Sequence, residues 1–318
     1  MTVVSRYLGR RLLQAVFVLW AAFTVSFTVL YLLPSDPVSI MAAGGGDTND
    51  VSPEQLAELK KTYGFDQPVA VQYGHRLWGA LHGDFGISVQ SGDKVTHMIS
   101  TQLPATLQLT SGALLLAVVL GAGTALWGTY TRQRWLRQAL LSLPALGVSA
   151  PTFWVGLVLV QIVSFRWGLV PAIGNDGFKS LILPVITLSL PTAAVIAQVF
   201  AKSLRTTLRE PYVETALAKG ASRARVHFRH AARNASIPAL TVVGVLVGNL
   251  LAGSVVVETV FSRTGVGRIT ATAVNAQDIP VVQGLVVFGA VVFVLANLAV
   301  DLVYPLLDPR ITAGAVTR

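Results

Sequence analysis

The chain has 318 residues, of which 53% are hydrophobic and only 12% are charged, and its formal net charge is +9. A soluble domain carries about 25% charged residues, so this chain has too few charges to cover a water-facing surface, and its apolar content excludes intrinsic disorder. It has no cysteine, which excludes disulfides, thiolate metal sites and cysteine nucleophiles.

Six long stretches of the chain contain no Lys, Arg, Asp or Glu. A membrane-spanning helix needs about 20 mostly apolar residues, and each stretch is long enough. In the second stretch the apolar part begins near Leu103. The six stretches are residues 12–35, 95–131, 138–165, 180–201, 234–257 and 279–300. The sequence therefore predicts an all-α integral membrane protein with six transmembrane helices. The first run is too long for a signal-peptide core and lacks a following A-x-A site, so we expect it to remain uncleaved.

The basic residues indicate the orientation. If the N-terminus is cytoplasmic, 16 of the 24 Lys and Arg residues fall on the cytoplasmic side. The positive-inside rule therefore predicts that both termini are inside. The loops account for the positive charge, so we expect no nucleic-acid partner.

We expect four parts along the chain. Residues 1–33 form the N-terminal cytoplasmic end and the first helix, and residues 34–103 form an external segment with short helices, the first beginning at Ser52. Residues 104–310 form a five-helix core, and residues 311–318 form a cytoplasmic tail. The external segment carries eight acidic and four basic residues. Within the core, the cytoplasmic loop 202–233 carries eight basic and two acidic residues.

This loop contains a clear helix signature. Pro211 suits the first helical turn, where its missing N–H is not needed. Glu214 lies near the positive end of the helix dipole. Lys219 followed by Gly220 is typical of a helix end. A second helical stretch is predicted from about Ser222 to Arg233, at an angle to the first, so that the two form a rigid knob.

The same residues resemble a known family. Glu214-Thr215-Ala216-x-x-x-Gly220 is similar to the E-A-A-x-x-x-G signature of ABC-importer permease subunits, with Thr215 in place of the first Ala. Further segments along nearly the whole chain resemble the dipeptide/oligopeptide/nickel permease family, B-type subunit. They include residues 6–13, 32–37, 63–68, 83–86, 103–106, 228–234, 258–261, 301–304 and 307–310. The usual I-x-L-P ending of the signature is replaced by residues 230–234 and Ile237-Pro238, as is typical of the peptide branch.

The resemblance implies a type I ABC-importer permease fold and a position in the prokaryotic cytoplasmic membrane. The implied partners are a second homologous permease, ABC ATPase subunits, an external substrate-binding protein that docks on residues 34–103, and membrane lipid. The substrates implied are di- or oligopeptides, nickel chelates or glutathione. The residues expected to couple to an ATPase are Tyr212, Glu214, Thr215, Ala216, Lys219 and Gly220.

The chain itself is expected to be non-catalytic and to bind no cofactor or metal. It lacks the G-x-x-x-x-G-K-[ST] phosphate loop, so ATP and Mg would be used by the partner ATPase subunits.

Polar residues in the fifth helix are candidates for the translocation pathway, because polar groups inside membrane helices are costly and often functional. Ser254 and Glu258 are four residues apart and share a helix face, and we include Asn249 with them. The alternative for Glu258 is an interfacial carboxylate neutralised by Arg263 or Arg268.

Two other classes of protein are considered. A secondary transporter would need coupling-ion sites, and few intramembrane charges are present to form them. An intramembrane zinc protease would need H-E-x-x-H, which does not occur. A serine hydrolase could be imagined at Ser149, but no intramembrane His is available as its base.

Overall fold

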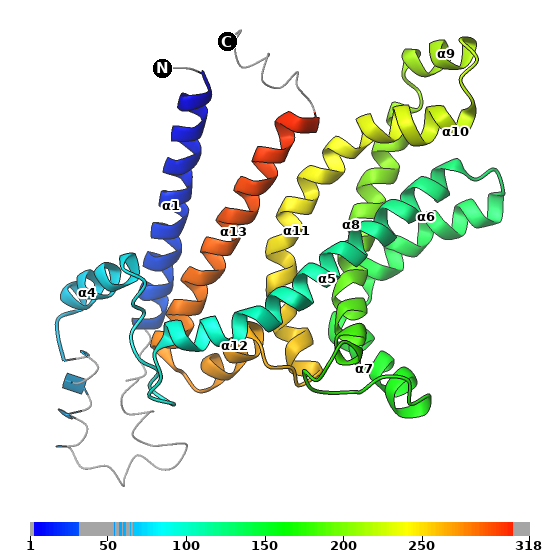
Figure 1. Cartoon of the computed structure of the whole chain (residues 1–318). Coiled ribbons are helices and arrows are strands. Elements are labelled where there is room, and N and C mark those ends of the chain that lie inside the picture. The colour runs from blue at the N-terminus through cyan, green and yellow to red at the C-terminus, as the bar shows by residue number, and fades with distance from the viewer. Residues whose placement is uncertain are drawn as a thin grey trace. The chain divides into compact units, whose positions relative to one another are not determined.

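The computed structural model describes residues 3–31 and 66–307, together with residues 54, 57, 58, 60, 61 and 64 (Figure 1). Within these residues the chain is helical, and extended pairing is confined to one isolated bridge between Ile87 and Lys94. The predicted helix start at Ser52 and the tail 311–318 lie outside the described residues. The helices are α1 (Val3–Tyr31), α4 (Val69–Leu81), α5 (Val95–Tyr130), α6 (Arg134–Ser149), α7 (Thr152–Leu159), η2 (Val160–Arg166), α8 (Lys179–Thr207), α9 (Pro211–Ala218), α10 (Arg223–Arg225), η3 (Val226–Ala231), α11 (Ala232–Val260), α12 (Val266–Asn275) and α13 (Ile279–Leu307).

The described part of the chain contains five helices that are long and apolar enough to cross a membrane. A sixth span is present if α6 is taken together with α7 and η2. The five are residues 11–30, 95–130, 179–207, 223–260 and 279–298. They coincide with five of the six predicted spans, so the prediction of an all-α membrane protein is confirmed.

The third predicted span differs from the structure. The sequence predicts one helix across residues 138–165, but α6 and the following helix are bent by 103° at a short break. The break is at Ala150, which is extended (φ −78°, ψ 126°) and precedes Pro151. A proline disfavours helical geometry in the residue before it and cannot donate a backbone hydrogen bond, which explains the break.

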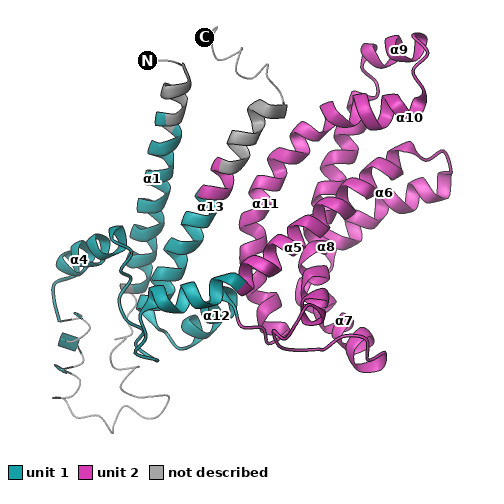
Figure 2. Cartoon of the chain, viewed as in Figure 1, with its two compact units in different colours: residues 1–104, 265–294 teal, residues 105–264, 295–318 magenta. Residues whose placement is uncertain are grey.

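The chain forms two compact units (Figure 2). Unit 1 comprises residues 1–104 and 265–294, and unit 2 comprises residues 105–264 and 295–318. Helix α8 is central to unit 2, since 61% of the residues in its most apolar 18-residue stretch are buried in the structure. Ala193, Ala197 and Ala201 are buried in α8. Small residues let helix backbones approach closely: a Cβ added at Gly121 of α5 would lie 2.7 Å from the carbonyl oxygen of Ala193.

In unit 1, a buried carboxylate fixes a loop. Asp278 directly precedes α13 and is almost completely buried. It accepts hydrogen bonds from the Ser88 hydroxyl and from the backbone N–H groups of Val89, Gln90 and Val281. The segment 84–95, which we call the tied loop, is thus joined to the start of α13. A carboxylate at this position also satisfies an orphan N–H of the helix.

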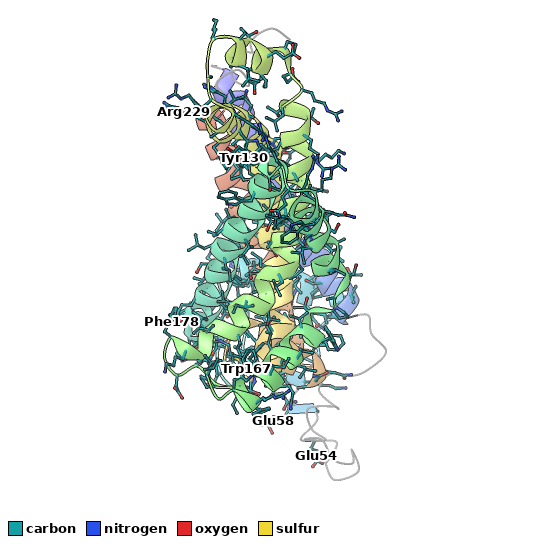
Figure 3. All side chains as sticks on the ribbon, turned by 90° about the vertical axis from the view of Figure 1, so that its right-hand side faces the viewer. Glu54, Glu58, Tyr130, Trp167, Phe178 and Arg229 are labelled. Carbon is teal, nitrogen blue, oxygen red and sulfur yellow. The ribbon has the colours of Figure 1, made fainter. Side chains whose placement is uncertain are left out.

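Aromatic side chains mark the two ends of unit 2. Figure 3 shows Trp167 and Phe178 at one end and Tyr130 and Arg229 at the other. Trp167 and Phe178 are largely exposed, as are Trp127 near Tyr130 and Trp135 at the start of α6. Exposed aromatic residues at the helix ends are typical of the two membrane–water interfaces. The separation of these groups along the helices therefore fits a membrane-spanning unit.

Candidate functional site

The segment between α8 and α11 begins with the short helix α9. Glu210 is extended (φ −70°, ψ 143°), Pro211 occupies the first helical turn, and Glu214 lies in that turn. Gly220 has φ +83°, and its N–H donates to the Leu217 carbonyl. This left-handed conformation favours glycine because it has no Cβ. The predicted helix and its glycine end are confirmed.

The stretch from Ser222 to Arg233 is helical, as predicted, but it is not a separate short helix. It forms α10 and η3 and continues directly into α11, so residues 223–260 make up one apolar span. The Ser222 hydroxyl caps its start by accepting from the Arg225 N–H. No glycine or proline lies between Ser222 and Arg233, and Pro238 lies inside α11 without ending it, so the helix continues.

The two ends of α9 differ in exposure. Val213 is buried, whereas Leu217 is 47% exposed. The Tyr212 hydroxyl accepts a hydrogen bond of 3.2 Å from Asn234 Nδ2 at the start of α11. Glu214, Thr215, Lys219 and Gly220 are exposed and Ala216 is half-buried. Val213 and Leu217 are four residues apart and share one face of α9, but this face is buried only at the first turn. The start of α9 therefore anchors the helix, and its C-terminal end, which we call the open end, presents a mixed apolar and charged surface to its surroundings.

The end of α5 holds the turn after α9. Arg223 donates from Nη2 to the Tyr130 carbonyl, and its guanidinium lies 4.9 Å from the centre of the Tyr130 ring. His227 hydrogen-bonds the Leu126 carbonyl at 3.1 Å, and the Phe228 and Tyr130 rings are 5.0 Å apart. Cation–π and aromatic contacts favour a fixed geometry. A displacement of α9 can thus be passed to α5 as well as to α11.

The three predicted pathway residues have different environments. Ser254 and Glu258 lie on one side of α11 and both are 1% exposed. The Ser254 hydroxyl donates to the Leu251 carbonyl, while Glu258 Oε1 accepts from the Thr106 hydroxyl of α5 at 2.7 Å. Asn249 is exposed and is not grouped with them. The structure therefore supports a buried polar contact between α5 and α11 at Glu258.

Sequence reasoning did not find Thr106 as a site residue, although it lies in the matched segment 103–106. Thr106 is buried, and its partner Glu258 is 152 residues away. A sequence pattern cannot identify such a pair, because helix periodicity specifies the face of a residue but not the opposing helix. The only available signal was the presence of a hydroxyl in an apolar run.

Arg263, which the sequence offered as one possible partner of Glu258, is buried just beyond α11. Its Nη1 donates to the carbonyls of Gly174 and Ser180 and to the Ser180 hydroxyl. Burial lowers the pKa of the Arg263 guanidinium, and the nearby Glu258 carboxylate opposes this shift. Arg263 therefore ties the loop after α11 to the start of α8 and contributes positive potential near Glu258.

The described residues contain no group of three or more His, Cys, Asp or Glu side chains arranged to hold a metal ion.

Comparisons with known proteins agree with this architecture. Residues 115–313 match the family described as "Binding-protein-dependent transport system inner membrane component", and residues 4–110 match its N-terminal component. The chain therefore belongs to this family of transport permeases, and it is a multi-pass membrane protein that works within a binding-protein-dependent system.

Individual members of this family are similar to the chain along almost its whole length. The chain is 36% identical to the dipeptide transport system permease protein DppB of Escherichia coli (strain K12), over 90% of this chain and 93% of that protein. It is also 36% identical to the glutathione transport system permease protein GsiC of Salmonella choleraesuis (strain SC-B67), over 96% of this chain and 98% of that protein.

A solved structure shows the fold. The MetNI methionine ABC transporter, in an inward-facing conformation, has a chain that matches 66% of this one and 96% of its own length, with a TM-score of 0.54 and 16% sequence identity. This confirms the ABC-transporter permease fold predicted from the sequence.

Proposed function

We propose that the chain is the permease subunit of an ABC importer that takes up small peptides, such as dipeptides, oligopeptides or glutathione. The observation that carries this proposal is the 36% identity to both DppB and GsiC over at least 90% of the chain. The names of these two relatives specify a dipeptide and glutathione, which is itself a small peptide.

The importer would assemble in the prokaryotic cytoplasmic membrane from this permease, a second homologous permease, ABC ATPase subunits and an external substrate-binding protein. ATP and Mg would be bound by the ATPase subunits, and this chain would be non-catalytic. The exposed apolar side chains of the spans, such as those of Leu115 and Val119, suit a surrounding of lipid and a second permease.

The helix α9 would be the coupling helix that docks on an ATPase. It has the features this role needs, because Val213 and Tyr212 anchor its start and the Arg223–Tyr130 contact holds the turn that follows it, while its C-terminal end stays exposed. Closure of the ATPase subunits would move α9, and the two long helices would carry the movement toward the pathway. Such rigid-body transmission is a general basis of alternating access.

Glu258 would be the charged group of the pathway, placed to attract the amino group of a peptide. Its carboxylate contacts Thr106 of α5 and lies on α11, and α9 is anchored on these same two helices. A movement of α5 against α11 would therefore change the exposure of Glu258, which links coupling to substrate passage.

The assembly is tested first by affinity purification of the tagged chain from its native host in mild detergent. Recovery of a second permease and of ABC ATPases is expected, and a chain that is recovered alone in gentle conditions would contradict the importer assignment.

Coupling is tested in the same complex with Gly220→Leu. A Cβ at Gly220 meets no atom within 4 Å, so the change adds bulk to the exposed end of α9 and strains one backbone position. ATP hydrolysis should continue while uptake of a labelled dipeptide or glutathione falls by about tenfold or more. Gly168→Leu is the matched control, since Gly168 also has positive φ and open surroundings but lies outside α9. Coupled uptake by the Gly220 variant at the level of the Gly168 variant would refute the coupling role.

A further inference from the structure

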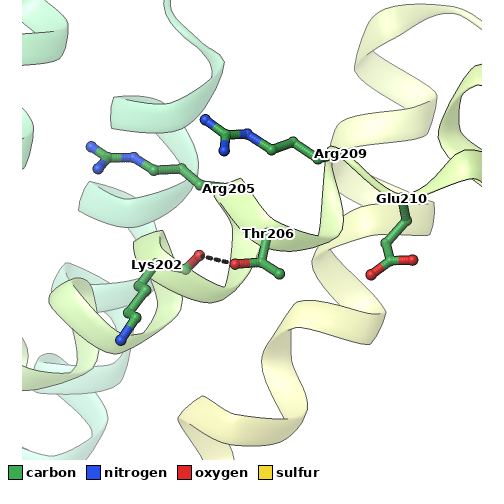
Figure 4. Close-up of a pocket in the computed structure, with 5 residues that line it drawn as sticks. All are labelled: Lys202, Arg205, Thr206, Arg209 and Glu210. Atoms are coloured by element: carbon green, nitrogen blue, oxygen red, sulfur yellow. Dashed lines mark hydrogen bonds between the residues drawn. The ribbon is translucent and has the colours of Figure 1, made fainter.

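An open basic pocket lies at the end of α8, just before α9. Its volume is about 430 Å³, and its lining residues are Lys202, Arg205, Thr206, Arg209 and Glu210. Arg205 and Arg209 follow Lys202 by three and seven residues. This spacing places the three residues along one side of the chain at this helix end. Figure 4 shows the side chains of Arg205 and Arg209 extending to the same side, with the Lys202 side chain pointing downward below them and the Glu210 carboxylate at the opposite side of the view.

These three cations are not neutralised within the part of the chain that the structure describes, since none of their side chains forms an ion pair or hydrogen bond with a described residue. The one hydrogen bond inside the pocket joins the Thr206 hydroxyl to the backbone carbonyl of Lys202 and uses no cationic group. Three positive groups around one hollow repel one another, and an anion placed between them would relieve that repulsion.

A second hollow joins the basic pocket. Its volume is about 150 Å³, and it shares Lys202 and Arg205 with the first. Its other lining residues come from α5, α6 and α8 and are mostly apolar: Thr124, Ala125, Leu140, Leu141, Pro144, Ala197, Gln198 and Ala201. The combined site therefore has a cationic end and an apolar end, which is the polarity of an anionic lipid.

The helices around the site also place it at the depth of lipid headgroups. Trp127 near the end of α5 and Trp135 at the start of α6 are 59% and 65% exposed. Exposed tryptophans mark the membrane–water interface, and basic pockets between membrane helices on the cytoplasmic side suit anionic headgroups.

We propose that this site binds an anionic phospholipid of the cytoplasmic leaflet. Lys202, Arg205 and Arg209 hold its phosphodiester, and the start of an acyl chain lies along Leu140, Leu141 and Pro144. The apolar hollow distinguishes this ligand from a free phosphate or an acidic surface of a partner protein, because neither of those would fill it. The bound lipid contacts α8 one turn before α9, so it also steadies the base of that helix.

Native mass spectrometry of the purified, delipidated full chain tests the proposal. It is titrated with phosphatidylglycerol and with phosphatidylcholine of identical acyl chains. Phosphatidylglycerol should bind at least about tenfold more tightly, and glycerol 3-phosphate should not displace it. Arg205→Gln alone should weaken phosphatidylglycerol about fivefold, and the triple variant Lys202→Gln, Arg205→Gln, Arg209→Gln should abolish the preference.

The matched control removes three exposed arginines beyond α9, in the variant Arg225→Gln, Arg229→Gln, Arg233→Gln, and should keep the preference within about twofold. Equal binding of the two lipids, or equal losses in the two triple variants, would overturn the proposal. Displacement by glycerol 3-phosphate would show a free-anion site instead. If the pocket variant keeps its lipid but no longer copurifies with an ATPase, the pocket is a protein contact and the lipid assignment is wrong.

Discussion

The tied loop of unit 1 and the helix α9 of unit 2 both connect longer helices, α4 to α5 and α8 to α11, but they differ in how their polar and apolar groups are placed. In the tied loop, Ser88 and Val89 are buried, and Asp278 accepts their hydrogen bonds. In α9 only Val213 is buried, and Leu217 is exposed beside charged groups.

The difference separates a connection whose polar groups are satisfied within its own chain from one that leaves an apolar side chain exposed. A buried carboxylate with four donors can be satisfied only by one loop geometry, because each unpaired donor would carry a desolvation penalty. An exposed leucine near the end of a helix that is anchored at its start leaves apolar area available to another protein. We therefore expect changes in the tied loop to lower stability and changes at the open end of α9 to lower association.

The largest effect is expected for Asp278→Ala. It removes the acceptor for the Ser88 hydroxyl and for the N–H groups of Val89, Gln90 and Val281. The loss should cost about 3 kcal/mol of stability and lower the unfolding temperature in detergent, followed by tryptophan fluorescence. Asp66→Ala, at an exposed aspartate, is the control and should change little. An Asp278 variant as stable as that control would show that the tied loop is not fixed by this carboxylate.

A pair of substitutions in α9 sharpens the comparison within one helix. Val213→Ala removes two buried methyl groups, at about 1.5 kcal/mol, and should speed tryptic cleavage of the loop 209–223 by about tenfold. Leu217→Ala should leave the cleavage rate unchanged and weaken binding of the ATPase subunit by about tenfold. The opposite pattern, with Leu217 governing cleavage and Val213 governing binding, would mean that the anchored start and the open end of α9 are wrongly assigned.

Glu258 can be compared with Asp278 as a second buried carboxylate. Its carboxylate accepts a hydrogen bond from a side-chain hydroxyl, that of Thr106, and glutamine can still accept this bond. Glu258→Gln keeps this hydrogen bond but removes the charge near buried Arg263, so it should lower the unfolding temperature less than Asp278→Ala does. Peptide uptake should fall by about tenfold because the charge is lost. Unchanged uptake and substrate preference in this variant would remove Glu258 from the pathway.

The smallest effect is expected for Tyr212→Phe, which removes the hydroxyl that accepts from Asn234 Nδ2. This part of α9 is partly exposed, so the loss should be about 0.5 kcal/mol and should raise tryptic cleavage of the loop by only about twofold. Tyr212→Ala also removes the ring and is the matched comparison. If the phenylalanine variant is cleaved as fast as the alanine variant, the hydroxyl and not the ring anchors this end of α9.

Much of the fold follows from local sequence signals. The uncharged stretches predict five of the spans because a membrane helix is specified by its own length and apolar content. The ends of α9 are predicted because Pro211 and Gly220 act through their own backbone geometry. The bend at Ala150 also has a local cause in Pro151, although the uncharged stretch by itself predicts one helix.

The contacts that define the site do not follow from such signals. The Ser88–Asp278 and Thr106–Glu258 pairs join residues that are 190 and 152 positions apart. Each depends on which helices pack together, and one sequence gives only the face on which each residue lies. The functional roles of Tyr212, Glu214, Thr215, Ala216, Lys219 and Gly220, and of Ser254, Glu258 and Asn249, remain predictions.

The most direct test of the central claim is the accessibility of α9 with and without the ATPase. The chain has no cysteine, so Leu217→Cys gives a single thiol at the open end of α9, and Gln133→Cys gives a control thiol at the exposed turn between α5 and α6. Each variant is treated with a membrane-impermeant maleimide, alone and in the copurified complex. We predict that Cys labelling at position 217 is strong in the isolated chain and falls by about tenfold in the complex, while labelling at position 133 is retained. Equal labelling at position 217 in both states, with the ATPase still bound, would contradict the assignment of α9 as the coupling helix.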